Sequence, residues 1–288
     1  MMQRKQKRTL IWVVVAVVIV VAGWFSFGPG LNFGSSKKAQ ATTVTVGVVG
    51  ETKQDEKIWD SVAETAKKKY NINLKVKNFT DYNQPNKALK SGSIDLNAFQ
   101  HYAFLNAWNK SNGGGVVAIG KTYIAPMKLY SKKYKSVKSI PNGAQIAVPN
   151  DASNESRALY VLKNAGLIQL KSGKTLATVA DITKNPKHLK IKEVSAEQTA
   201  RVLDSVDASI VNNDYAAAAN LSSKYAIYTE PVNKDSEQWI NVIAAKKGNQ
   251  NKKAYKDVVK AYQTATTKRL YKKYYGNSQI AAWDVTLK

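Results

Sequence analysis

Residues 42–79, TTVTVGVVGETKQDEKIWDSVAETAKKKYNINLKVKNF, decide the fold. Residues 43–49 are rich in β-branched side chains and predict a strand, which Gly50 ends. Residues 54–70 predict a helix, because their apolar side chains recur every three or four positions and share one face: Ile58, Trp59, Val62, Ala63 and Ala66. Acidic residues in the first turn and lysines in the last turn suit the helix dipole. Residues 74–79 predict the next strand.

The same alternation continues along the chain and then restarts. Further strands are predicted at 94–99 and 116–119, with a short helix that Pro85 opens and Gly92 closes and another helix at 102–109. Beyond an extended stretch at 123–131, the elements expected are strands at 145–149, 189–194, 208–211 and 239–244, a helix at 156–165, and one long basic helix at about 253–275. Alternating strands and helices predict two α/β units with a ligand cleft between them.

The first 41 residues differ in composition from the rest. Residues 10–27 are apolar except Gly23 and Ser26, and at about 1.5 Å per residue they approach the roughly 30 Å of a bilayer core. Residues 1–9 are basic, which keeps them in the cytoplasm and directs the remainder outward. Residues 28–41 predict a flexible linker. The span is either a retained anchor or a cleaved signal, and the distance from the apolar run to the Ala-x-Ala triplet at 39–41 favours the anchor.

Composition and motifs argue against an enzyme. The 288 residues include 44 Lys and Arg, 20 Asp and Glu, and no Cys, with a net charge of +24. The absence of Cys excludes disulfide scaffolds, thiolate metal sites and cysteine nucleophiles. His101 and His188 are too few for a typical zinc site. Gly-x-Ser-x-Gly, phosphate-loop, dinucleotide-binding and His-Glu-x-x-His motifs are missing. We therefore expect no catalysis, no metal and no cofactor.

Polar clusters follow four of the predicted strands, at 81–86, 97–101, 150–157 and 212–215. Each cluster alone has an ordinary explanation, because Asn and Asp are common in turns and at helix N-caps. Ligands of open α/β sheets, however, bind outside the carboxyl ends of the strands, where such loops meet. Two clusters from each α/β unit favour a ligand site over turn chemistry.

Four strings in these regions resemble one known family. They are FTDYNQPN at 79–86, DLNAFQH at 95–101, AVPNDASN at 147–154 and NPKHLKI at 185–191. They resemble the NlpA/MetQ methionine-binding lipoproteins, which are extracytoplasmic receptors of an ABC importer. The resemblance runs from about residue 44 to the C-terminal helix. It implies an amino-acid transport protein, a solute-binding protein that captures methionine or a related amino acid or short peptide for a membrane permease and its ATPase.

The resemblance also implies an architecture and a site. The fold would be α/β and two-lobed, of the type II periplasmic-binding-protein kind, with residues 43–126 and 226–288 in lobe 1 and residues 127–225 in lobe 2. The lobes would close on the ligand by hinge motion, and we expect a monomer. The substrate-binding residues implied are Tyr82, Phe99, His101, Phe104, Asn154, Arg157 and Asn212.

Roles follow for several of these residues by resemblance. Arg157 would pair with the ligand carboxylate. Asn212, assisted by Asn154, would hydrogen-bond the amino-acid backbone of the ligand. The rings of Tyr82, Phe99 and His101 would form an aromatic wall against a thioether.

The chain departs from the family pattern at three places. Phe104 stands where a tyrosine is common, and Ser156 stands where glycine is common before the helix arginine. The family is held by a lipid on an N-terminal cysteine, which this chain lacks. The span 10–27 would then be a substitute anchor, giving a single-pass protein of the cell membrane with its binding domain on the extracytoplasmic side.

The alternative is a basic cell-surface adhesin or polyanion-binding protein. Residues 1–41 hold six basic and no acidic side chains, so the net charge of +24 leaves 24 − 6 = +18 on the remainder, which would give salt-dependent affinity for anionic polymers. The lysines, however, are scattered along the chain and are not interleaved with aromatic residues in one element. We therefore expect no specific nucleic-acid partner, and this alternative stays behind the transport interpretation.

Overall fold

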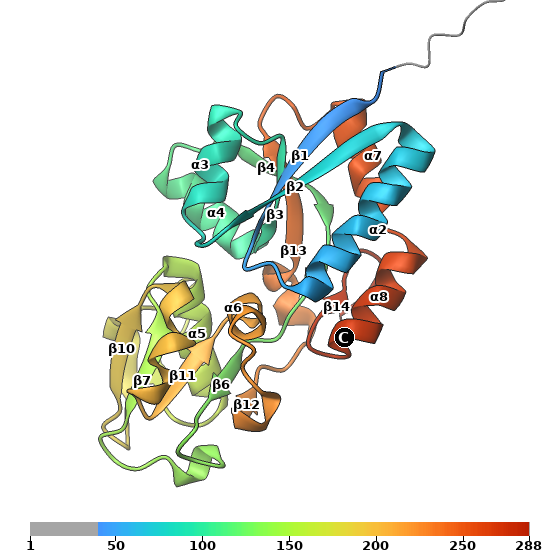
Figure 1. Cartoon of the computed structure of the whole chain (residues 1–288). Coiled ribbons are helices and arrows are strands. Elements are labelled where there is room, and N and C mark those ends of the chain that lie inside the picture. The colour runs from blue at the N-terminus through green and yellow to red at the C-terminus, as the bar shows by residue number, and fades with distance from the viewer. Residues whose placement is uncertain (1–39, 288) are drawn as a thin grey trace, which may run out of the picture. The chain divides into compact units, whose positions relative to one another are not determined.

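The computed structural model describes residues 40–287. The first strand of this region belongs to a five-stranded sheet (Figure 1). Its order is β2-β1-β3-β13-β4. The strands are β1 (Thr42–Val49), β2 (Ile72–Phe79), β3 (Leu96–His101), β4 (Val116–Lys121) and β13 (Asn241–Lys246). β1 runs parallel to β2 and β3, whereas β13 is antiparallel to β3 and β4. The carboxyl ends of β1, β2 and β3 therefore meet at one edge.

Helices cover both faces of this first sheet (Figure 1). α2 (Lys53–Tyr70), α7 (Lys253–Tyr262) and α8 (Ala265–Tyr275) pack on one face, and α3 (Gln84–Ser91) and α4 (Tyr102–Ser111) pack on the other. The predicted face of α2 is buried at Ile58, Trp59, Val62 and Ala66. Its first turn is fixed by a capping box in which Thr52 accepts from the backbone N–H of Asp55 and the Asp55 carboxylate accepts from that of Thr52.

A second five-stranded sheet has the order β10-β7-β11-β6-β12. Its strands are β6 (Lys128–Tyr130), β7 (Gln145–Pro149), β10 (Lys190–Val194), β11 (Ala208–Val211) and β12 (Ala226–Thr229). β7 is parallel to β10 and β11, and α5 (Ala152–Asn164) packs against them. Both sheets belong to one compact body that begins at Ala41. The first sheet with its helices is called the first unit below, and the second sheet with its helices is called the second unit.

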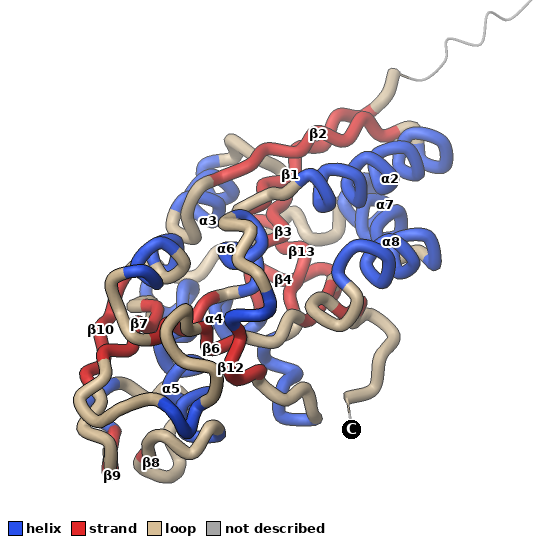
Figure 2. The backbone as a smooth tube through the Cα atoms, turned by 60° about the horizontal axis from the view of Figure 1, so that its bottom comes forward, coloured by secondary structure: helices blue, strands red, loops and turns tan. Residues whose placement is uncertain are grey.

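The chain passes between the sheets twice, after β5 (Tyr123–Ile124) and after β12. α6 (Asn213–Ala218) lies between the two groups of strands in both views (Figure 2). Its Tyr215 and Ala216 join a core cluster with Phe79 and Leu89 of the first unit. This cluster packs the two sheets together beside the edge where their parallel strands end.

Short elements complete the described part of the chain. β14 (Ile280–Ala281) pairs with β5, and β8 (Gln169–Leu170) pairs with β9 (Ile182–Lys184). The 3-10 helices are η1 (Val137–Ser139), η2 (Val179–Asp181), η3 (Ala196–Gln198), η4 (Arg201–Asp204), η5 (Ser223–Tyr225) and η6 (Lys234–Trp239).

The prediction of one long helix at 253–275 was wrong. Thr264 is extended, with φ −117° and ψ 158°, and its hydroxyl accepts from the backbone N–H of Thr267, so α8 starts anew after α7. The expected extended stretch 123–131 contains β5 and β6, which belong to different sheets. β12, which the expected division places with lobe 1, hydrogen-bonds to β6 in the second sheet.

The predicted segments 1–9 and 10–27, and all of the linker except its last two residues, lie outside the described residues. Within residues 40–287, none of the helices combines the length and the apolar character needed to cross a bilayer.

Candidate functional site

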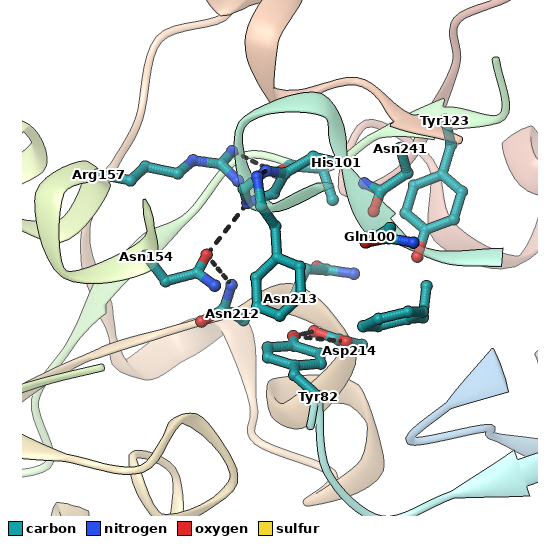
Figure 3. Close-up of a pocket in the computed structure, with 13 residues that line it drawn as sticks. Tyr82, Gln100, His101, Tyr123, Asn154, Arg157, Asn212, Asn213, Asp214 and Asn241 are labelled. Carbon is teal, nitrogen blue, oxygen red and sulfur yellow. Dashed lines mark hydrogen bonds between the residues drawn. The ribbon is translucent and has the colours of Figure 1, made fainter. Parts of the chain in front are cut away.

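A pocket lies where the two sheets face each other across the ends of their parallel strands (Figure 3). It is lined by Tyr82, Phe99, Gln100, His101, Phe104, Tyr123, Ala125, Asn154, Arg157, Asn212, Asn213, Asp214 and Asn241. These include all seven residues expected from the sequence. The edge position is the one at which open α/β sheets bind ligands.

Each unit supplies part of the lining from a strand end or a first helical turn. From the first unit, Tyr82 follows β2, Phe99 and His101 end β3, and Phe104 lies in the first turn of α4. From the second unit, Asn154 and Arg157 lie in the first two turns of α5, and Asn212 is the N-cap of α6. The pocket is therefore shared by both units.

His101 has a defined tautomer. Its Nδ1 accepts from the backbone N–H of Phe104 at 3.0 Å, because His101 is the N-cap of α4. The ring proton therefore sits on Nε2, which donates to Oδ1 of Asn154 at 3.2 Å. Burial, and then the positive charge of Arg157, lowers the pKa of His101 to about 3. The imidazole is neutral at physiological pH.

The two asparagines of the second unit hold each other in fixed orientations (Figure 3). Oδ1 of Asn154 accepts from Nδ2 of Asn212 at 2.8 Å, and Nδ2 of Asn154 donates to both oxygens of Asp151. Oδ1 of Asn212 is then the free end of its amide: it is buried and has no hydrogen-bond partner within residues 40–287. Nδ2 of Asn213 is likewise buried and has no hydrogen-bond partner within residues 40–287. Both atoms belong to residues that line the pocket, and buried polar atoms usually have a hydrogen-bond partner.

Arg157 is buried and already paired. Its Nε donates to Glu230, and its Nη2 donates to Oε2 of Glu230 at 2.6 Å and to the carbonyl of Ala125 at 2.9 Å. The ring of Trp239 lies 4.8 Å from the guanidinium carbon. The Nε–Nη2 edge, which a bidentate ligand contact would use, is therefore occupied by protein. Within residues 40–287, the hydrogen bonds of Arg157 use Nε and Nη2, and none of them uses Nη1.

Tyr82 and Asp214 join the two units at the opposite side of the pocket (Figure 3). The Tyr82 hydroxyl donates to the Asp214 carboxylate, at 2.7 Å from Oδ1 and 2.6 Å from Oδ2. Burial raises the pKa of Asp214 to about 6, although the Tyr82 bond acts in the other direction. Burial and the Asp214 charge raise the pKa of Tyr82 well above its usual value. Asp214 thus places a negative charge in the pocket at neutral pH.

The apolar part of the lining is aromatic. The ring centroids of Tyr82 and Phe99 lie 5.8 Å apart, and each of these rings lies 5.7 Å from that of Phe104. Tyr215 extends the group behind Tyr82, at 4.8 Å. Phe104 brings no hydroxyl to the pocket, and Tyr123 of β5 is the further tyrosine in its lining.

Several lining residues were not among those expected. Asn213 and Asp214 belong to the polar cluster at 212–215, and Gln100 belongs to the string at 95–101, so the sequence carried a signal for these three. Asn241 was missed for a physical reason. It begins β13 opposite His101, and because β13 is antiparallel its amino end lies at the edge where the parallel strands have their carboxyl ends. Asn241 is the first residue of its strand, so a polar run after a strand does not reveal it.

The donors and acceptors suit a small zwitterion with an apolar side chain. Arg157 can meet a carboxylate, the free oxygen of Asn212 can accept from an ammonium group, and the aromatic rings can cover apolar atoms. Within residues 40–287, no cluster of three or more acidic or histidine side chains is arranged to hold a metal ion.

Comparisons with known proteins identify the family of this chain. Residues 44–283 match the family model described as NlpA lipoprotein. The "Probable D-methionine-binding lipoprotein MetQ" of Pasteurella multocida (strain Pm70) is 39% identical over 245 residues, which cover 84% of this chain and 87% of that protein.

Two solved structures share the fold at high sequence identity. The substrate-binding protein of a methionine transporter from Streptococcus pneumoniae is 47% identical, with a TM-score of 0.79, covering 84% of this chain and 96% of that one. A nutrient-binding protein from Burkholderia cenocepacia bound to methionine is 44% identical, with a TM-score of 0.79, covering 83% of this chain and 99% of that one. The expected α/β, periplasmic-binding-protein-like fold is confirmed. With the family model matching most of its length, this chain belongs to the NlpA lipoprotein family.

Proposed function

We propose that this protein captures methionine, or a closely related amino acid or short peptide, outside the cytoplasmic membrane and delivers it to the permease and ATPase of an ABC importer. The relatives named for methionine binding or methionine transport support this proposal. The observation that carries it is the unpartnered, buried Oδ1 of Asn212 in the same pocket as the Arg157 guanidinium. A ligand ammonium and a ligand carboxylate satisfy these two groups together.

In the proposed complex, the ligand lies between Arg157 and Tyr82. Its carboxylate accepts from Nη1 of Arg157, and its ammonium donates to Oδ1 of Asn212 near the Asp214 carboxylate. The side chain points to the rings of Phe99 and Phe104, where a thioether makes sulfur–aromatic contacts worth about 0.3–1.5 kcal/mol. His101 and Asn154 hold Asn212 in the required orientation. The protein binds and releases its ligand unchanged, without catalysis.

Calorimetry on residues 42–288 tests the ligand and the site. L-Methionine is expected to bind saturably, and Asn212→Ala or Arg157→Ala should each cost on the order of 2–3 kcal/mol of binding free energy, because each leaves a charged ligand group unpaired. Asn73→Ala and Arg201→Ala are matched controls at exposed positions outside the pocket. Wild-type affinity in the pocket variants would overturn the site assignment.

The same measurement separates transport from the adhesin alternative. A protein that binds polyanions but shows no saturable response to any amino acid or dipeptide would overturn the transport proposal. Mass spectrometry of the small molecule that co-purifies with the protein then identifies which amino acid or peptide is carried.

We also propose that residues 10–27 hold the protein in the membrane as a single-pass anchor, with the binding part outside. The chain has no cysteine to carry a lipid, and the apolar run approaches the roughly 30 Å thickness of a bilayer core. The mass of the membrane-extracted protein tests this directly. A mass corresponding to an N-terminus near Thr42 would mean that the segment is a cleaved signal.

A further inference from the structure

We propose that Glu230 is a positioning residue for ligand binding: it fixes the Arg157 guanidinium so that Nη1 faces the ligand carboxylate. Glu230 does not line the ligand pocket. It would act through Arg157 alone. This inference rests on the proposed contact between Arg157 and the ligand.

The contacts of Glu230 leave the guanidinium one orientation. Nε of Arg157 lies 3.0 Å from Oε1 and 3.1 Å from Oε2, and Nη2 lies 2.6 Å from Oε2. Two charge-assisted bonds along one edge of a planar group fix its plane and its rotation. The indole of Trp239 covers one face of that plane at 4.8 Å. Nη1 is the nitrogen that these contacts leave over, and Arg157 lines the pocket.

Glu230 is itself held by the backbone of the first crossover. Its Oε2 accepts from the backbone N–H of Met127 at 2.9 Å, and its own backbone N–H donates to the Met127 carbonyl at 2.9 Å. Arg157 adds its bond to the carbonyl of Ala125. The guanidinium is therefore tied to both crossovers, since Ala125 and Met127 lie in the first and Glu230 follows β12 in the second.

The pair also sets the charge that a ligand meets. The side chains of Arg157 and Glu230 are only 4% and 10% exposed, so each charge needs the other. Because Glu230 balances Arg157, the pocket offers a ligand carboxylate an oriented N–H donor and little net positive charge. Orientation, and not bulk attraction, then determines how strongly the carboxylate is held.

The test compares two ligands that differ at the carboxylate. L-Methioninol keeps the ammonium and the thioether of L-methionine but has a hydroxyl in place of the carboxylate. Glu230→Gln keeps the size of the side chain and an oxygen for the Met127 N–H, but loses the charge that orients Arg157. We expect it to weaken L-methionine binding on the order of tenfold and L-methioninol binding less than twofold, by calorimetry.

A double-mutant cycle supplies the second measurement, and it needs only L-methionine. On an Arg157→Gln background, Glu230→Gln should produce no further loss of affinity, because Glu230 then has nothing to position. Equal loss for both ligands, or additive losses in the cycle, would overturn the positioning role and indicate a structural one. Thermal unfolding of each variant shows whether it is folded at the temperature of the titration.

The experiment distinguishes failure of the Glu230 inference from failure of the proposed contact between Arg157 and the ligand. If Arg157→Gln alone weakens both ligands equally, the proposed carboxylate contact is wrong and the role of Glu230 falls with it. If Arg157→Gln is selective for L-methionine while Glu230→Gln is not, only the positioning inference fails.

Discussion

At the scale of single residues, His101 shows how a local backbone contact decides the chemistry of a pocket. Its position as the N-cap of α4 makes Nδ1 an acceptor, which leaves Nε2–H for Asn154. Because burial lowers its pKa to about 3, we predict that the ring stays neutral, with its proton on Nε2, between pH 5 and 8. Nitrogen-15 NMR of the imidazole checks this, and His188, which is exposed to solvent at its turn, serves as the internal reference. A protonated His101 at pH 6 would contradict it.

Asp214 gives a residue-scale prediction about pH. Its folded-state pKa of about 6 lies above its usual value of 3.8, so between these values the folded protein holds more protons than the unfolded chain. The contribution of Asp214 to the free energy of unfolding therefore falls as pH rises from about 4 to about 6. Asp214→Asn should be more stable than wild type at pH 7, by about 1–2 kcal/mol given the partial exposure of the side chain, and should lose this advantage near pH 4.

Thermal unfolding of both proteins from pH 4 to 7 measures the difference between them. Glu51, whose pKa burial raises to about 7, titrates in both proteins, so the difference isolates Asp214. A difference that does not change with pH would contradict the prediction.

The site residues that the sequence predicted differ in their place along the chain from those that the sequence did not predict. Tyr82, Arg157 and Asn212 lie in polar runs that follow parallel strands, where composition alone marks the site. Glu230 and Asn241 reach Arg157 or the pocket only because the chain returns from the second sheet to the first. Proximity of this kind depends on tertiary structure, and local sequence carries no sign of it.

At the scale of elements, periodicity predicted where helices lie better than where they end. The buried face of α2 was predicted correctly, because an amphipathic pattern reports which side is buried. The break between α7 and α8 was missed, because the apolar spacing gives no sign of it. Gln263, with ψ 62°, and Thr264, with ψ 158°, leave the helical conformation, and the Thr264 hydroxyl caps the new helix.

The capping box of α2 gives a prediction at this scale. The Thr52 hydroxyl bonds to Asp55 at its N–H and carboxylate, and Tyr275 at the end of α8 donates to the same carboxylate at 2.7 Å. Thr52→Ala should therefore cost about 1 kcal/mol of unfolding free energy, which corresponds to roughly 2–4 °C in Tm for a domain of this size. Thr80→Ala, at an exposed position, is the control. Equal Tm values for the two variants would show that the cap contributes nothing.

At the scale of the whole described unit, the alternation of strands and helices predicted two α/β sheets, and the fold is confirmed by the relatives. The membership of the returning strands was harder to predict. β12 pairs with the second sheet and β13 enters the first sheet antiparallel, because the second crossover falls between them. Along the chain the two sheets are connected only by the segments 125–127 and 230–240, and two such connections permit hinge motion.

The hydrogen bonds between Tyr82 and Asp214 give a prediction about that motion. They join the two units directly, and without them the Asp214 carboxylate loses a donor, at a cost of about 1–3 kcal/mol to the closed arrangement. Tyr82→Phe should therefore shift the ligand-free protein toward an open form and weaken methionine binding about 5- to 100-fold, because less of the protein is competent to bind. Small-angle X-ray scattering should show a larger radius of gyration for the ligand-free variant than for wild type, and equal radii when both are saturated with methionine.

Tyr160→Phe is the matched control for this experiment. Its hydroxyl donates to the carbonyl of Lys174 at 2.6 Å, within the second unit, so its loss removes a tyrosine hydrogen bond without touching the contacts between units. A Tyr82→Phe variant that binds methionine weakly but has the wild-type radius when ligand-free would place the effect on the ligand itself. An increase in radius only for Tyr82→Phe, reversed by methionine, would assign the Tyr82–Asp214 pair to closure, because a direct ligand contact cannot change the shape of the empty protein.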